Sequence, residues 1–112
     1  MNRKSLSTLA AVILALPLSL LSACGAPSAL DLCFMGCDYN KKCLSSSDVD
    51  LTNCRNNCTD KKGTFSDADN QLAKDCKNAG EIRSKQAACY SKACGEVPGC
   101  LLSNDTNACV RP

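Results

Sequence analysis

Two short segments decide the fold of this chain: CFMGC at residues 33–37 and CRNNC at residues 54–58. Each segment places two cysteines at positions i and i+4, one turn apart on the same face of an α-helix. Sixteen residues lie between the two segments, enough to end one helix, turn and begin another. In an antiparallel helix pair the two sites face each other in reverse order, so the spacing favours two nested disulfides. These are Cys33–Cys58 and Cys37–Cys54.

This twin C-x3-C arrangement resembles the disulfide-stapled α-helical hairpins of several unrelated exported or intermembrane proteins. The resemblance implies an architecture and no particular activity. Val, Ile and Thr are sparse after residue 30, and no six-residue stretch alternates apolar and polar residues, which disfavours strands. We therefore expect an all-α fold, a small disulfide-rich helical-hairpin domain of about four short helices. The expected helices are 29–44, 49–62, 66–79 and 81–93.

Capping residues set the expected helix ends. Ser28, with Asp31 in the first turn, is placed to cap the first helix. The other boundaries follow from polar caps at N-termini and glycine at C-termini. They are Asp48 and Ser66 at the starts of the second and third helices, and Gly63, Gly80 and Gly95 just beyond the ends of the second, third and fourth. Pro98-Gly99 predicts a turn, and 100–112 predicts a loop or a short helical turn.

The other six cysteines of the domain have weaker geometric constraints. Cys43 lies six residues after Cys37, about 240° around the helix, and so faces away from the first staple. Two cysteines flank the expected turn at Gly80 at comparable distances, which suggests a second hairpin closed by a disulfide. The resulting pairs are Cys76–Cys89, Cys43–Cys94 and Cys100–Cys109. Ten cysteines allow many pairings, so alternatives to these three stay open.

The first 23 residues have the features of an export signal. Arg3 and Lys4 supply a positive start, and an apolar run extends over residues 6–23. The boundary Leu21-Ser22-Ala23-Cys24 resembles the lipobox of bacterial lipoproteins. That resemblance implies attachment of diacylglycerol to the Cys24 thiol and cleavage before Cys24. The new amino group can then receive a further acyl chain of the palmitate kind.

The number of cysteines supports this interpretation independently. The chain has 11, and an odd number in an exported protein requires an explanation. If Cys24 carries lipid, ten cysteines remain for five disulfides. These ten are Cys33, Cys37, Cys43, Cys54, Cys58, Cys76, Cys89, Cys94, Cys100 and Cys109. Two alternatives stay open: ordinary signal cleavage near Ala23 or Ala26, with Cys24 free or removed, and an uncleaved membrane anchor.

The expected organisation has three parts: a lipoprotein signal peptide (1–23), a lipidated tether (24–29) and a Cys-rich helical domain (30–112). Two or three acyl chains would hold the protein firmly on a bilayer. We expect an exported protein, lipid-anchored to the cell envelope. In bacteria with two membranes, glycine instead of aspartate at position 25 implies transfer to the outer membrane.

Composition excludes several kinds of activity. Without Arg3 and Lys4, 11 basic residues balance 11 acidic ones, so we expect no nucleic-acid partner. The chain has no histidine and no C-x-x-C motif, which disfavours imidazole catalysis and thiol-disulfide chemistry. An oxidising compartment would convert C-x3-C thiolates into disulfides, so we expect no metal and no other cofactor. The acidic segments 48–50 and 67–70 lack the glycine and glutamate of a calcium-binding EF-hand, and are interpreted as helix N-termini.

Large apolar side chains are few: 16 lie between residues 30 and 110. Their burial cannot by itself offset the conformational entropy of ordering a chain of this length. Disulfides must therefore supply much of the stability, and we expect that the reduced chain does not hold its fold.

These observations favour a protein that is not an enzyme, and that binds or shields as an envelope lipoprotein. Its expected partners are the lipid bilayer, through acylated Cys24, and an unidentified envelope or extracellular protein. The alternative is a tethered helical-hairpin inhibitor of an exogenous hydrolase, in which an exposed lysine near a turn occupies a protease specificity pocket. The candidate lysines are Lys41, Lys42, Lys61, Lys62, Lys85 and Lys92.

Overall fold

The computed structural model describes residues 25–112, which are helical and contain no strand. Four longer helices come first: α2 (Ala29–Cys43), α3 (Asp48–Asp60), α4 (Lys62–Asp75) and α5 (Ala79–Cys89). A 3₁₀ turn, η1 (Cys94–Glu96), leads to the short helices α6 (Val97–Leu102) and α7 (Asn104–Asn107). The all-α, disulfide-rich class is confirmed. The expected signal peptide and Cys24 lie outside the described residues.

Two serines fix the starts of α2 and α3. The Ser28 hydroxyl accepts a hydrogen bond from the Asp31 N–H at 3.1 Å, and the Asp31 carboxylate accepts one from the Ser28 N–H at 2.9 Å. Ser47 and Asp50 form the same reciprocal pair, with both bonds at 3.1 Å. These capping boxes satisfy backbone donors that the first turn of a helix leaves unpaired. The predicted Ser28 cap is confirmed. The predicted Asp48 cap is wrong by one residue, because Ser47 is the cap and Asp48 is the first residue of α3.

The predicted glycine boundaries are wrong. Gly63 and Ser66 lie inside α4, Gly80 lies in the first turn of α5, and Gly95 belongs to η1. None of these glycines has a positive φ, the conformation that makes glycine useful at a helix C-terminus. Only one residue, Lys61, separates α3 from α4. Tertiary packing, and not glycine, therefore decides where these helices break.

The segment after α5 is more helical than predicted. Pro98 lies in the first turn of α6, where its missing N–H leaves no hydrogen bond unmade, so Pro98-Gly99 begins a helix and does not form a turn. The Ser103 hydroxyl then accepts a hydrogen bond from the Asp105 N–H and caps α7. Two short helices thus occupy a region that was expected to be mostly loop.

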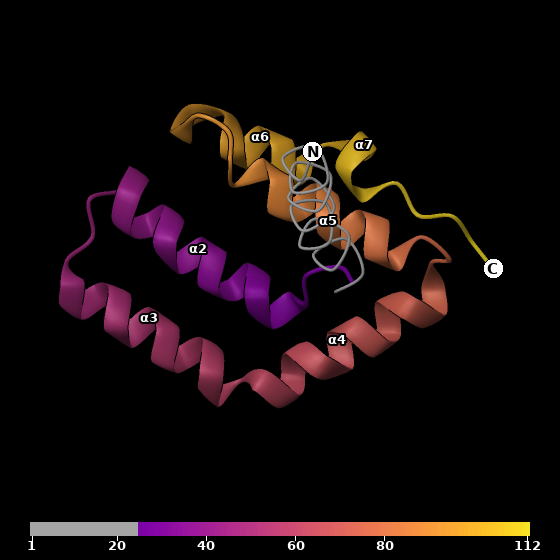
Figure 1. Cartoon of the computed structure of the whole chain (residues 1–112), viewed down its shortest axis with the longest axis horizontal. Coiled ribbons are helices and arrows are strands. Elements are labelled where there is room, and N and C mark those ends of the chain that lie inside the picture. The colour runs from indigo at the N-terminus through magenta and orange to yellow at the C-terminus, as the bar shows by residue number, and fades with distance from the viewer. Residues whose placement is uncertain (1–24) are drawn as a thin grey trace, which may run out of the picture.

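α2 is the central helix and contacts α3, α4 and α5. Figure 1 shows α3 running antiparallel beside α2, α4 leaving the end of α3 in a new direction, and α5 returning on the other side of α2. α6 and α7 lie beyond α5 in the same view. Residues on different faces of α2 therefore meet different neighbours.

The predicted nested disulfides are confirmed. Cys33–Cys58 and Cys37–Cys54 join α2 to α3, with Cα–Cα distances of 5.9 and 5.7 Å. The predicted Cys43–Cys94 bond is also present and ties the end of α2 to η1. These three bonds connect α2 to neighbours on two sides.

The other two predicted pairs are wrong: the structure forms Cys76–Cys109 and Cys89–Cys100. The physical reason is that α5 is one continuous helix. Cys89 is the last residue of α5, about 15 Å along the helix axis from the first residue at about 1.5 Å per residue, whereas Cys76 lies just before α5 begins. The two cysteines are therefore too far apart to be joined across a turn. A disulfide needs Cα atoms within about 7 Å.

The C-terminal tail instead runs back to the α4–α5 junction. The Lys77 N–H donates to the Val110 carbonyl at 2.7 Å, and the Asn78 side chain donates to the Ala108 carbonyl at 2.7 Å. The Val110 N–H donates to the Asn78 amide oxygen at 2.8 Å. These bonds bring Cys109 to Cys76.

The core of the described region is small. Its buried apolar residues are Ala29, Cys37, Cys58, Cys76, Ile82, Cys89 and Val97. Four of these seven residues are half-cystines, so the disulfides also form much of the buried core. None of the helices within residues 25–112 has the length and apolar character needed to cross a membrane.

Candidate functional site

A groove lies between the C-terminal half of α2 and the end of α5 with the turn after it. Its volume is about 290 Å³. Half-buried residues and exposed residues both contribute to its lining. The half-buried ones are Met35, Tyr39, Cys43, Ala87 and Tyr90, and the exposed ones are Asp38, Lys42, Ser91 and Lys92.

Two tyrosines form the apolar centre of this groove. The rings of Tyr39, on α2, and Tyr90, after α5, pack edge to face with their centroids 6.3 Å apart and their planes at 63°. The Tyr39 hydroxyl donates to the Cys94 carbonyl at 3.4 Å. The Tyr90 hydroxyl lies over the α2 backbone, 3.6 Å from where a Cβ on Gly36 would be. The Cys43–Cys94 bond holds the two sides of the groove together.

The exposed charges of the groove are mainly positive. Asp38 is already engaged, because its carboxylate accepts a hydrogen bond from Arg55 at 2.6 Å. Lys42 and Lys92 take part in no ion pair and no side-chain hydrogen bond within residues 25–112. Burial raises the pKa of Tyr90, and the neighbouring Tyr39 raises it further. The groove therefore combines an aromatic centre with two available ammonium groups.

A second recess, of about 460 Å³, lies among α2, α4, α5 and α6. Leu32, Phe65 and Leu101 give it an apolar lining, Arg83 and Gln86 are its polar helix residues, and Tyr90, which also lines the first groove, lies at its edge. Both polar side chains are already used: Arg83 donates to Asp69 at 3.0 Å, and Gln86 donates to Asn107 at 3.0 Å. Within the described part of the chain this recess therefore has no available charged group to orient a ligand, whereas the Tyr39–Tyr90 groove has Lys42 and Lys92.

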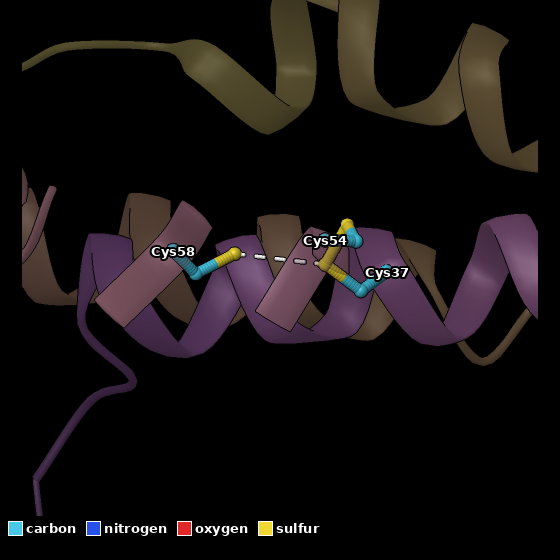
Figure 2. A group of neighbouring side chains, drawn as sticks. All are labelled: Cys37, Cys54 and Cys58. Carbon is cyan, nitrogen blue, oxygen red and sulfur yellow. Dashed lines mark hydrogen bonds between the residues drawn. A yellow bond between two sulfur atoms is a disulfide. The ribbon is translucent and has the colours of Figure 1, made fainter. Parts of the chain in front are cut away.

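Three sulfur atoms gather where α2 meets α3. The Sγ atoms of Cys37, Cys54 and Cys58 lie within 4.8 Å of one another, and Figure 2 shows them in the hairpin interface. The Cys37 and Cys58 sulfurs, which belong to different disulfides, are 3.6 Å apart. Metals bind thiolates, and a cysteine in a disulfide has no thiolate to offer. In this oxidised state the three sulfur atoms pack in the interface of α2 and α3, and their role is structural.

The segment before α2 (25–28) joins the N-terminal end of α2, whereas the groove lies toward the C-terminal end of that helix. Ala26, Pro27 and Ser28 line a shallow recess with residues of α4 and α5, and a Cβ on Gly80 would lie 3.4 Å from that of Ala26. Asp69 lies within α4, so its segment (67–70) is not the helix start predicted from sequence. Its carboxylate accepts a hydrogen bond from Ala29, the first residue of α2, and thus caps a different helix.

The lysines considered as inhibitory residues are spread over the surface. Lys41 is held at the hairpin loop by Asp48, at 2.9 Å, and by the Ser46 carbonyl, at 3.2 Å. Lys85 pairs with Glu81 at 3.3 Å. Lys61 and Lys62 lie at the junction of α3 and α4, and Lys42 and Lys92 line the groove.

The sequence interpretation missed the tyrosine pair, although a signal for it exists. Tyr39 precedes Cys43 by four residues, and Tyr90 precedes Cys94 by four residues. Once Cys43 and Cys94 are paired, the two tyrosines upstream of them are expected near each other. The Asp69 contact has no comparable local signal, because the residues that it joins are 40 positions apart.

Comparison of the chain with known protein families, with curated proteins and with solved structures finds no match. The site must therefore be interpreted from its own chemistry.

Proposed function

We propose that this protein is a lipoprotein of the cell envelope, held to the membrane through Cys24, and that its helical domain binds a partner without catalysing a reaction. In a bacterium with two membranes, the anchor is expected to lie in the outer membrane. The observation that carries the proposal is the division among the 11 cysteines. All ten from Cys33 to Cys109 pair with one another, and the eleventh is the cysteine of the lipobox-like sequence.

The layout of the domain supports a binding role directed away from the membrane. Cys24 is five residues before Ala29, where α2 begins. The groove lies toward the other end of α2, and Lys42 is about 20 Å along the helix from Ala29 at about 1.5 Å per residue. A partner approaching from outside the membrane can therefore reach the groove.

The alternative, a tethered hydrolase inhibitor, has weaker support. Such an inhibitor needs a basic side chain free to enter a protease pocket. The α2–α3 loop (44–47) contains no lysine, and Lys41 beside it is already bound to Asp48. Lys42 is unpaired within residues 25–112, but it lies within α2 and lines the groove instead of projecting from a loop. A protease panel still tests it: potent inhibition that is lost on mutation of a single lysine would favour the inhibitor over the binding module.

Intact mass spectrometry of the protein purified from its native membrane tests the proposal. We expect a chain that starts at Cys24, the added mass of the lipid, and five disulfides. The Cys24→Ser variant should lose the lipid mass and leave the membrane fraction while keeping the five disulfides. A mature chain that starts elsewhere, or carries no lipid, would overturn the anchor. Labelling of several domain cysteines by an alkylating reagent without prior reduction would overturn the disulfide assignment.

A further inference from the structure

We propose that the Tyr39–Tyr90 groove binds an acidic peptide segment of a protein partner, with one aromatic side chain of that segment seated against the packed pair of tyrosines. The proposal rests on the binding role given above and specifies the chemistry of the partner.

The size of the groove favours one inserted side chain. At about 290 Å³ it is at the lower limit of the range of about 300–1,000 Å³ usual for sites that enclose a whole small molecule. Single aromatic side chains that fill a central pocket are common anchors of protein interfaces. The exposed edges of Tyr39 and Tyr90, together with Met35, offer the aromatic and thioether contacts that such an anchor makes.

The charge of the groove favours acidic residues on either side of that anchor. Lys42 is on α2 and Lys92 follows α5, so the two ammonium groups come from opposite sides of the groove. The one carboxylate in the lining, that of Asp38, is neutralised by Arg55. A segment with a carboxylate on each side of an aromatic residue complements this arrangement.

The position of the groove disfavours the anchoring membrane as its occupant. An anionic bilayer could also attract two lysines, but the tether approaches at the Ala29 end of α2 and the groove lies toward the Cys43 end. A peptide of another protein is therefore the occupant that both the charge and the layout favour.

The chain provides its own spectroscopic probes for a test. It has two tyrosines, both in the groove, and no tryptophan. The protein is purified in neutral detergent and titrated with the blocked peptide Glu-Glu-Trp-Glu-Glu. The tryptophan fluorescence then comes from the peptide alone. NMR signals of isotope-labelled tyrosine rings report on the groove, and the Tyr39 signal separates it from the second recess, which Tyr90 also lines and Tyr39 does not. We expect saturable changes in both signals with the same dissociation constant.

Matched peptides and variants decide the specificity. The peptides Glu-Glu-Ala-Glu-Glu and Lys-Lys-Trp-Lys-Lys should leave the tyrosine signals unchanged. The double variant Lys42→Glu/Lys92→Glu should bind Glu-Glu-Trp-Glu-Glu at least about tenfold more weakly. Lys62→Glu, an exposed lysine at the start of α4, should change affinity by about twofold or less, because salt screens distant charges. All the lysines changed are exposed, so the variants should keep the disulfides and the helical circular dichroism of the parent.

Three results would overturn the inference. The first is equal binding of all three peptides or no binding at all, and the second is an equal loss of affinity in Lys62→Glu. The third is a tyrosine shift of the same size when the protein is moved from neutral to anionic phosphatidylglycerol vesicles, which would make the membrane the occupant. Lipid on Cys24 is measured separately by mass, so the inference can fail while the anchor stands.

Discussion

The carboxylate of Asp69, within α4, accepts a hydrogen bond from the backbone N–H of Ala29, the first residue of α2, with both of its oxygens 3.1 Å from the nitrogen. Arg83, from α5, donates to the same carboxylate at 3.0 Å. One half-buried side chain thus joins three helices at the point where the chain from Cys24 reaches the domain. Backbone N–H groups at a helix start favour a negative charge, and the guanidinium of Arg83 stabilises that charge further.

Replacing Asp69 with Asn should therefore destabilise the domain. Hydrogen bonds to a charged group contribute about 1.5–3 kcal/mol, so we expect Asp69→Asn to lower the free energy of unfolding by about 2 kcal/mol. Asp67→Asn is the matched control, since Asp67 is exposed on the same helix and should cost about 0.5 kcal/mol or less. Urea denaturation followed by circular dichroism measures both. Equal effects of the two substitutions would contradict this role for Asp69.

The buried hairpin disulfide should be worth more than the disulfide of the C-terminal tail. Chain-entropy arguments predict the reverse order by about 0.6 kcal/mol, because Cys76–Cys109 spans 33 residues and Cys37–Cys54 spans 17. Each pair has one buried half-cystine, Cys37 at 1% and Cys76 at 4% exposure. The Cys37 sulfur, however, contacts that of Cys58 in the small core, and its partner Cys54 is half-buried whereas Cys109 is exposed. Replacing Cys37 and Cys54 with Ala thus removes core packing as well as a cross-link.

We expect the double variant of Cys37 and Cys54 to melt at a lower temperature than the double variant of Cys76 and Cys109. Complete reduction of the parent protein should abolish most of its helical circular dichroism, because most of the buried apolar residues are half-cystines. A reduced chain that keeps its helices and melts cooperatively would show that the small core suffices without the disulfides.

Tyr90 should ionise at a pH above that of an ordinary tyrosine. Burial raises its pKa, and Tyr39 raises it further. In Tyr39→Phe, the single remaining tyrosine can be followed by ultraviolet absorbance, and its pKa should stay above the ordinary value of about 10 because burial is the larger cause. Because the pKa of Tyr90 is higher in the folded protein, its neutral hydroxyl favours the folded state. That contribution to the free energy of unfolding is complete below the ordinary pKa and is lost as the pH rises through the folded pKa. An ordinary pKa for Tyr90 in this variant would mean that its hydroxyl is fully hydrated and that the groove is more open than described.

The start of α3 should show the opposite pH dependence. Hydrogen bonds from the Ser47 backbone N–H and then from its hydroxyl lower the pKa of Asp50. The stability that these hydrogen bonds give to the charged Asp50 carboxylate is present above the ordinary pKa of Asp50. It is lost as the pH falls through the lowered pKa in the folded protein. In Ser47→Ala, we expect the pKa of Asp50 to move up toward its ordinary value, as measured by NMR titration of the carboxyl carbon.

Ser46→Ala is the control for this substitution. Ser46 is the neighbouring residue in the loop, and its hydroxyl makes no hydrogen bond within the described residues. It should leave the pKa of Asp50 unchanged, and a shift equal to that of Ser47→Ala would rule out the capping box as the cause.

The sequence by itself determined the features that depend on short-range periodicity. Cysteines at i and i+4 must share a helix face, so the twin segments at 33–37 and 54–58 led directly to an antiparallel hairpin with two nested disulfides. The Ser28 cap is equally local, because the groups that it joins are three residues apart. The helical class of the domain followed from the same kind of evidence.

Only the tertiary structure decided how the distant parts of the chain close on one another. The pairs Cys76–Cys109 and Cys89–Cys100 depend on where α5 begins and on the return of the tail to Asn78. The contact of Asp69 with Ala29 likewise joins helices whose relative placement no local pattern encodes. Local spacing fixes which face of a helix a side chain occupies, whereas the choice of neighbour depends on the packing and cross-linking of all the helices together.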